Sequence, residues 1–321
     1  MNKITLIALL TGIITFTSFN ARPHHKAVLR TIIIDPGHGG FDYGCSGLFS
    51  REKDVALSIS MKLGAAIQEA FPEIKIVYTR TTDIMPGNAS SIHAGLRVRA
   101  DVANKAKGDL FICIHANSNG HSAGQYEVRH LVGHKLVKKG KRKVRQPVYE
   151  YETRKNMTVG TTSYIWKAMW GQYKGTQINE KDLGGEDMGD STATPMDMSS
   201  PEARIRAQLY EKRYFANSAF FGQLVQDEFV KAGRKTEGVQ QREVGIWVLE
   251  ATGMPSVLIE TGYLTNEEEE KYLNSEEGQH EVVQNILDAF IKYKDSVEGN
   301  RKSNAGIDST TSGSGEPKSQ R

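Results

Sequence analysis

Cysteine is scarce in this chain of 321 residues, which contains only Cys45 and Cys113. Two cysteines are too few for a disulfide-rich secreted scaffold. In an exported chain they can form one disulfide, but their spacing does not decide whether they pair. Cys113 lies in the strand-like run Leu110–Ile114, where a cysteine usually serves as a small core residue.

The chain also lacks a strong excess of charge of either sign. Its 41 lysines and arginines stand against 38 acids, which gives a net charge of +3. Composition therefore gives no reason to expect a nucleic acid as a partner, and we predict none. The hydrophobic content of 38% and the charged content of 25% are typical of a soluble globular protein, and the length allows a substantial core.

The apolar run at the N-terminus is too short for a membrane span. Met1–Lys3 carries one positive charge, and Ile4–Phe19 is apolar apart from small or hydroxylated residues. This pattern is typical of a secretory signal, whereas a membrane anchor, the main alternative, needs about 20 apolar residues. We therefore predict a signal peptide over residues 1–21 and an exported protein, periplasmic or associated with the cell envelope, without a transmembrane segment after cleavage. No cysteine lies near the cleavage region, so a lipoprotein anchor is not expected.

Strand-like and helix-like segments alternate in the first part of the chain. The expected strands are Thr31–Ile34, Lys75–Thr79 and Leu110–Ile114, and the expected helices are Glu52–Ala70, which Ser50 can cap, and Ile92–Lys107. This rhythm predicts an α/β fold with a mixed, mostly parallel sheet flanked by helices. We place it in a single catalytic domain over residues 30–293.

The alternation fails between Arg129 and Pro201. Residues 129–155 contain ten lysines or arginines against two acids, and residues 171–201 are rich in Gly, Asp, Ser and Thr. We interpret residues of about 129–204 as a long insertion. Its basic run is either a solvated loop or a contact for an anionic polymer or a partner.

Regular structure returns after the insertion. We expect helices over Ala203–Lys231, from Glu267 (capped by Thr265 or Asn266) and over Glu277–Tyr293, and strands over Ile246–Leu249 and Val257–Ile259. Residues 296–321 contain almost no apolar side chains, so we predict a disordered tail.

Polar side chains follow three of the expected strands. His38 lies in a Gly-rich loop after the first strand, His115 follows the third, and Glu260 ends the run Val257–Ile259. Ligand sites of open α/β sheets lie outside the carboxyl ends of their strands. Each residue alone has a plain structural interpretation, but a carboxylate that ends an apolar run is costly to bury without a partner.

Glu52 lies in the first turn of a helix that begins beside the His38 loop. The helix dipole favours an acid there in any case. Two imidazoles and one carboxylate are nevertheless a standard catalytic zinc set, which leaves a fourth position for water. A second carboxylate near that water can take its proton and return it to a leaving amine.

These motifs resemble those of the zinc-dependent N-acetylmuramoyl-L-alanine amidases of the amidase-3 family, which include cell-division amidases. The resemblance covers roughly residues 30–128 and 205–293. It is carried, in order, by Ile34–Gly40, Glu52, Thr79–Arg80 with Asp83, Leu96 and Arg99 leading to Ala103–Asn104, Leu110–Ser118, and Pro255–Asn266. Several motifs in the right order are far more specific than any one of them.

The resemblance implies that His38, Glu52 and His115 hold zinc (Zn²⁺) and that Glu260 is the general base and acid. The implied reaction is hydrolysis, by zinc-activated water, of the amide between the lactyl group of N-acetylmuramic acid and L-alanine of the peptidoglycan stem peptide. Alternatives are a zinc peptidase or deacetylase that acts on another cell-wall amide, and a non-catalytic wall-binding regulator.

Four further residues receive supporting roles from this reading. Asp35 and Asn117 are expected to support the ligands or shape their loops. Arg80 and Arg99 are expected to be structural ion-pair residues.

The insertion separates His115 from Glu260 by 145 residues, a departure from the simplest members of the family. By analogy with division amidases it is predicted to be autoinhibitory until an activator protein moves it. One acid of the insertion could occupy the open zinc position, and the candidates are Glu150, Glu152, Glu180, Glu186 and Glu202. No wall-binding repeat is visible at either end, so targeting is expected to come from the insertion, the tail or a partner.

Overall fold

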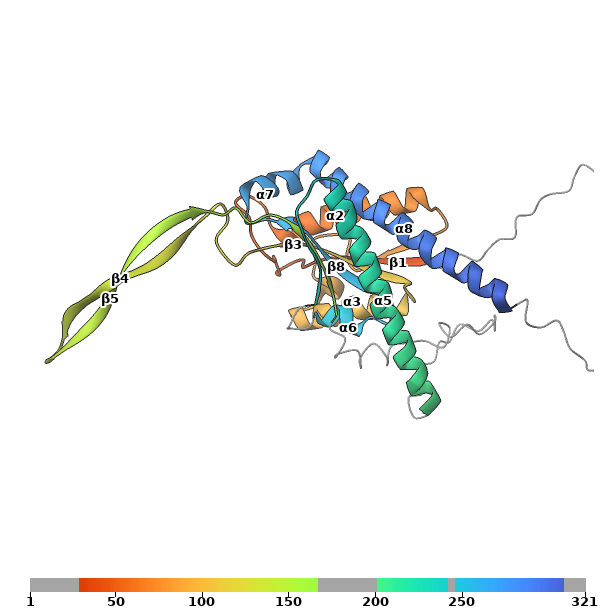
Figure 1. Ribbon diagram of the computed structural model, residues 1–321, viewed down its shortest axis with the longest axis horizontal. Coiled ribbons are helices and arrows are strands. Elements are labelled where there is room, and N and C mark those ends of the chain that lie inside the picture. Colours follow the sequence, from red (N-terminus) through yellow and green to blue (C-terminus); the bar gives the residue numbers. More distant parts are fainter. Residues whose placement is uncertain (1–28, 167–200, 242–245, 309–321) are drawn as a thin grey trace, which may run out of the picture.

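A six-stranded sheet forms the centre of the molecule, and its strand order brings the predicted site strands together. The computed structural model describes residues 29–166, 201–241 and 246–308 (Figure 1). The strands are β1 (Thr31–Pro36), β2 (Lys75–Tyr78), β3 (Leu110–Asn117), β6 (Thr161–Ile165), β7 (Thr236–Gln241) and β8 (Ser256–Tyr263), in the order β2-β1-β3-β8-β6-β7. Only the β6–β8 pair is antiparallel. The predicted mixed, mostly parallel sheet is confirmed.

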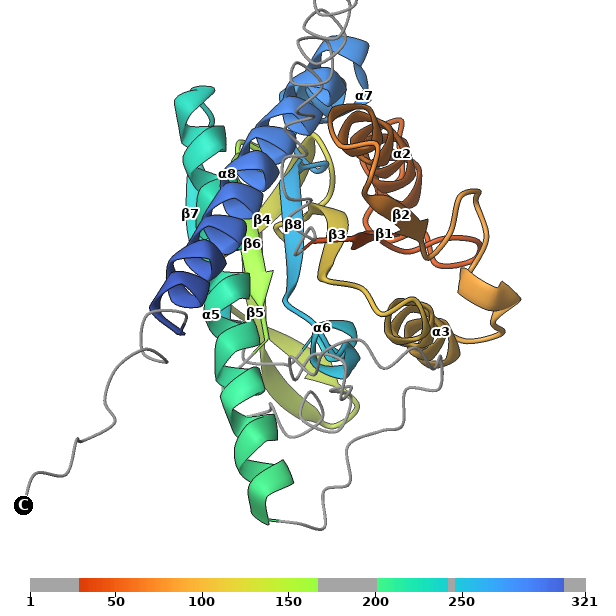
Figure 2. The ribbon, with the colours of Figure 1, turned by 90° about the vertical axis from the view of Figure 1, so that its right-hand side faces the viewer.

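Helices cover both faces of this sheet (Figure 2). They are α2 (Glu52–Ala70), α3 (Ile92–Lys105), α5 (Pro201–Lys231), α6 (Trp247–Ala251), α7 (Glu267–Asn274) and α8 (Glu276–Asp308), with a short 3₁₀ turn at Pro86–Asn88. Ile32 and Ile34 of β1 pack in the core beneath α2, α5 and α8, whereas Ile33 packs in a second core with α3 and α6. Successive side chains of a strand point to opposite faces of the sheet, and helices cover both faces here. The run Ile32–Ile34 of β1 is therefore apolar without interruption. None of the described helices is long and apolar enough to cross a membrane.

Two predicted assignments in the C-terminal half were wrong. The run Ile246–Leu249 was expected to be a strand, but Ile246 is the N-cap of the short helix α6, which begins at Trp247 and whose Val248 and Leu249 are buried in the second core. For an apolar run this short, the spacing of hydrophobic residues cannot decide between a strand and a buried helix. Helix α8 continues to Asp308, so residues 296–308 are helical and not disordered as predicted. Residues 309–321 lie outside the described part of the chain.

Strand β6 corrects the predicted extent of the insertion. Residues 161–165 return from the insertion into the central sheet and are fully buried. This strand was not predicted, because Thr161, Thr162 and Ser163 give it no hydrophobic pattern. Hydrogen bonds join the Thr161 and Ser163 hydroxyls to the amide of Gln226 in α5, which satisfies these polar groups inside the core.

The basic part of the insertion is an ordered β-hairpin. Strands β4 (Gln125–Lys139) and β5 (Arg142–Lys155) pair antiparallel and project away from the body (Figure 1). The hairpin base is fixed where β3 ends, because the side chains of Asn119 and Asn156 exchange hydrogen bonds of 2.8 and 3.0 Å. The insertion therefore contains a ribbon in a fixed position and a strand of the main sheet.

The loop before α2 is held from the far end of the chain. Asn266 caps α7, as predicted, by accepting from the backbone N–H groups of Glu268 and Glu269. Glu270 of the same helix is completely buried and accepts hydrogen bonds from the backbone N–H groups of residues 48–50. The Ser50 hydroxyl also donates to Glu270, so it does not cap α2 as predicted. Glu270 thus fixes the segment that leads into Glu52.

We predict that Glu270→Ala lowers the free energy of unfolding by about 3 kcal/mol, because four donors of the loop lose an acceptor that is completely buried. Urea unfolding measures this loss. The matched control, Glu268→Ala, removes an exposed carboxylate from the same helix and is expected to change stability by less than about 0.5 kcal/mol. Equal effects of the two substitutions would show that Glu270 is not the anchor of this loop.

Candidate metal centre

The backbone of the loop after β1 turns sharply at His38. Its φ of 56° lies in the left-handed region, which non-glycine residues seldom adopt. The preceding Gly37 lies against the ring of His115, and a Cβ there would come within 2.5 Å of the imidazole. Gly37 therefore lets the two histidines approach, with ring centroids 4.7 Å apart. Such strain at one residue is typical of functional sites.

Two buried arginines hold this loop in place. Arg99 pairs with buried Asp35 and also donates to the carbonyl oxygens of Pro36 and His38. Arg80 donates to the carbonyl oxygens of Pro36, Gly37 and Lys53. The predicted structural ion pair is confirmed for Arg99, whereas the hydrogen bonds that the structure gives Arg80 go to backbone carbonyls. Both side chains fix the backbone around His38 and Glu52.

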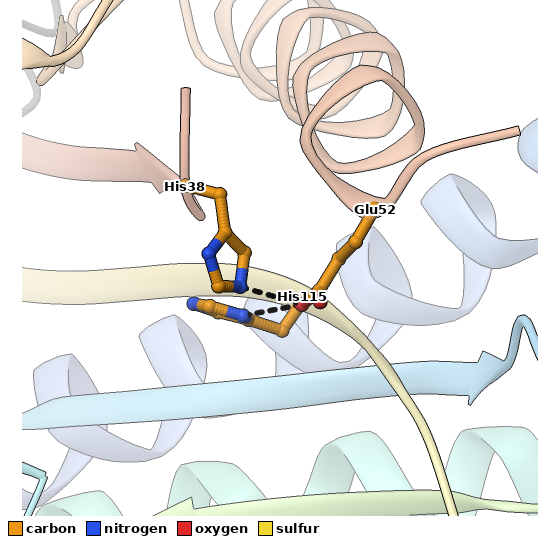
Figure 3. Close-up of side chains that lie close together, drawn as sticks. All are labelled: His38, Glu52 and His115. Atoms are coloured by element: carbon orange, nitrogen blue, oxygen red, sulfur yellow. Dashed lines mark hydrogen bonds and ion pairs between the residues drawn. The ribbon is translucent and has the colours of Figure 1, made fainter. Parts of the chain in front are cut away.

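Three predicted ligands meet in this structure (Figure 3). The Glu52 Oε1 atom lies 3.1 Å from His38 Nε2 and 2.6 Å from His115 Nδ1. The three residues each offer one ligand atom, and these atoms all lie within 4.8 Å of one another. Their donor set and their spacing fit a divalent metal ion such as zinc.

Groups around the ligands orient them. Asp42 Oδ2 lies 2.9 Å from His38 Nδ1, which leaves Nε2 of the same ring facing Glu52. The second oxygen of Glu52 accepts from the backbone N–H of Cys45 at 2.8 Å. Asp42 was not among the residues predicted from the sequence, where its only signal is its position four residues after His38 in the same loop. Carboxylates that bind the outer nitrogen of a histidine are a common feature of metal sites.

The charges of the three residues compensate one another. Burial acts to raise the pKa of Glu52, but hydrogen bonds from His115 and His38 outweigh it and hold the pKa well below its usual value. Burial likewise acts to lower the pKa of His38, but Asp42 and Glu52 raise it to about 9. For His115 burial prevails, and its pKa is lowered. Glu52 is therefore ionised at neutral pH, as a metal ligand must be.

Glu260 lines the same pocket as the three ligands. This pocket has a volume of about 340 Å³ and is also lined by Asp42 and Asn117. The backbone of Glu260 in β8 pairs with His115 in β3, and only 5% of the residue is exposed. The four residues proposed from the sequence thus lie together near the carboxyl ends of β1, β3 and β8.

The other expectations about this region have mixed outcomes. Cys45 and Cys113 are both free, and the Cys113 thiol lies 3.0 Å from Asp35 Oδ2. Glu150 and Glu152 lie on the projecting hairpin, where Glu152 pairs with His130 and Arg154 rather than with a metal site. Of the other candidate blocking acids, Glu180 and Glu186 lie outside the described residues, and the side chain of Glu202 is not described.

We predict that Asp42→Ala weakens zinc binding about 10- to 100-fold, because His38 loses the carboxylate that orients its ring. Competition with a chromophoric chelator measures the affinity. Asp42→Asn keeps an acceptor and is expected to lose less, whereas His38→Ala should remove measurable tight binding. An unchanged affinity in Asp42→Ala would exclude the orienting role.

Comparison with known proteins agrees with this geometry. A family model described as N-acetylmuramoyl-L-alanine amidase matches residues 32–292. The amidase AmiC of Escherichia coli O6:H1 is 30% identical over 267 residues, which are 82% of this chain and 52% of that protein. The amidase AmiA of Salmonella typhimurium is 24% identical, over 82% of this chain and 76% of its own length. The chain thus spans about half the length of AmiC.

The fold is shared with a solved structure. The crystal structure of the N-acetylmuramoyl-L-alanine amidase from Clostridium difficile 630 superposes with a TM-score of 0.52 at 21% identity, covering 84% of this chain and 98% of that one. Because the family model matches most of the sequence, and because its fold is the one found here, this chain belongs to the N-acetylmuramoyl-L-alanine amidase family.

Proposed function

We propose that the protein is a peptidoglycan hydrolase that cleaves the amide between N-acetylmuramic acid and L-alanine of the stem peptide. The observation that carries this proposal is the convergence of His38, Glu52, His115 and Glu260 on one pocket. Membership of the family supports the choice of this amide. A non-catalytic regulator would be expected to lack one of these residues.

The proposed metal ligands are His38, Glu52 and His115. A zinc ion held there supplies Lewis-acid polarisation of the amide carbonyl and activation of water. The chain's own contribution is to keep Glu52 ionised between the two imidazoles and to fix the direction of the His38 ring through Asp42. The arginine side chains hold the backbone of the His38 loop by donating to the carbonyl oxygens of Gly37 and His38.

Glu260 is the proposed general base and acid. It lies on a central strand, so its backbone cannot shift without breaking the sheet on both sides. Its carboxylate can take a proton from the attacking water and deliver it to the amine of L-alanine as the bond breaks.

The protein is further proposed to act outside the cytoplasm, where peptidoglycan lies. The signal peptide predicted over residues 1–21 supports this location, although it falls outside the described residues. Roles in cell division and regulation by an activator protein rest on the resemblance to division amidases.

We predict that Glu260→Gln lowers the release of stem peptides by about 10²- to 10⁴-fold, because the proton transfer is lost while the zinc ligands stay. Muropeptide analysis of digested peptidoglycan measures release, and zinc content is determined in parallel. The control Glu268→Gln changes an exposed acid and should keep full activity. A zinc-loaded native protein that releases no peptide with an L-alanine amino terminus would refute the cleavage assignment.

The predicted autoinhibition can be tested by shortening the insertion. Replacing residues 167–200 with a short flexible linker keeps both β6 and α5, and it is expected to raise the activity of the purified protein severalfold. Muropeptide release per minute is the readout. If the shortened protein folds and binds zinc but is no more active than the native chain, residues 167–200 are not the inhibitory segment.

A further inference from the structure

The hairpin of β4 and β5 stands clear of the central sheet (Figure 1). The described part of the chain buries none of the residues 125–155, so both faces of the ribbon are accessible to solvent. An isolated two-stranded hairpin is at best marginally stable in water. A ribbon of this length without a packed face therefore needs an explanation beyond the stability of the fold.

Charge is strongly segregated along this ribbon. Residues 133–149, which we call the hairpin tip, contain seven lysines or arginines and no acid. The three acids of the hairpin, Glu127, Glu150 and Glu152, all lie nearer its base. Since the whole chain carries +3 and the tip alone carries +7, the remainder of the chain has a formal charge of −4.

The arrangement of charges at the tip destabilises the hairpin. Lys138 lies directly opposite Lys143, and Lys139 lies directly opposite Arg142. Like charges in directly opposed positions destabilise a hairpin. At the base the pattern is different, because Glu152 pairs with both His130 and Arg154. A local conflict with stability of this kind is typical of a functional surface.

The two faces of the tip indicate the shape of the partner. Opposed residues share a face and successive residues alternate, so the pair Lys138–Lys143 points to one face and the pair Lys139–Arg142 to the other. Leu136 and Val137 are divided between the faces in the same way. A flat membrane would contact only one face and would favour an apolar one. Cations on both faces instead suit a flexible anionic polymer that can follow the ribbon around.

We propose that the hairpin tip is a docking surface for peptidoglycan, whose free stem-peptide carboxylates pair with the tip cations. The inference rests on the proposed function, because the substrate it names is the polymer cleaved in the pocket. A body with a charge of −4 repels an anionic polymer, and the tip supplies the attraction that the body lacks. The Asn119–Asn156 contact fixes the ribbon beside the end of β3, so docking raises the local concentration of substrate near the site.

Binding without turnover tests this proposal. In a Glu260→Gln background, Lys138, Lys139, Lys141 and Lys143 are replaced by Gln, and binding to insoluble peptidoglycan is measured by sedimentation at low salt. We expect about ten-fold weaker binding, and high salt should remove the difference. The matched control replaces four exposed lysines of the body, Lys75, Lys105, Lys212 and Lys235, and should change binding less than two-fold.

Two further arms identify the binding group and the ligand class. Peptidoglycan whose carboxyl groups have been amidated should bind the unsubstituted hairpin as weakly as untreated peptidoglycan binds the tip variant. Equal losses in the tip and body variants, or no loss in the tip variant, would overturn the proposal. So would a tip variant that loses binding to phosphatidylglycerol vesicles or polyphosphate but retains binding to peptidoglycan.

Failure of the proposed function would look different. If the Glu260-intact protein binds peptidoglycan through its tip but releases no stem peptide, the docking proposal is supported and the amidase assignment is refuted. Because the substitutions remove opposed like charges, the tip variant should unfold thermally no earlier than its parent. Circular dichroism checks this, so weaker binding cannot be attributed to misfolding.

Discussion

The metal centre depends on two buried guanidinium groups that bind backbone carbonyl oxygens. Arg80 and Arg99 together hold the carbonyls of residues 36–38, and Arg80 also holds that of Lys53, the residue after Glu52. Burial and the neighbouring charge of Arg99 lower the pKa of Arg80 to about 10, so the Arg80 side chain remains charged at neutral pH. Buried charges of like sign are tolerated only when acceptors surround them. Here those acceptors are Asp35 and the very loop that carries His38, so stability and site geometry are coupled.

The order of the strands accounts for the rest of the site. β3 lies between β1 and β8, so the ends of these three strands place His38, His115 and Glu260 next to one another. Glu52 comes from a helix rather than a strand, and its position depends on the loop that Glu270 of α7 anchors. Residues more than 200 positions apart therefore cooperate to bring one carboxylate between two imidazoles.

The sequence predicted which strands carry the site residues, because apolar runs and the breaks after them are local signals. The predicted ends were too early, since β3 continues past His115 to Asn117 and β8 continues past Glu260 to Tyr263. His38, His115 and Glu260 each follow such a run, and the parallel sheet brings them together. Neither strand β6 nor the role of Asp42 was predicted, because both depend on tertiary contacts. The buried hydroxyls of β6 need Gln226 of a distant helix, and Asp42 gains its role only through the turn at His38. Helix α6 shows the converse, since an apolar run is compatible with either a strand or a buried helix.

The position of the hairpin also resolves an electrostatic conflict. A centre that is to hold a divalent cation is weakened by positive charge nearby, yet attraction of an anionic polymer requires such charge. Screening at physiological salt acts over about 8 Å. Eight residues of extended strand separate the base of the ribbon from the first residue of its tip, which corresponds to roughly 26 Å. The tip therefore lies about three screening lengths beyond the base of a ribbon that projects away from the body (Figure 1), so its cations can attract a polymer without lowering the affinity of the centre for its metal.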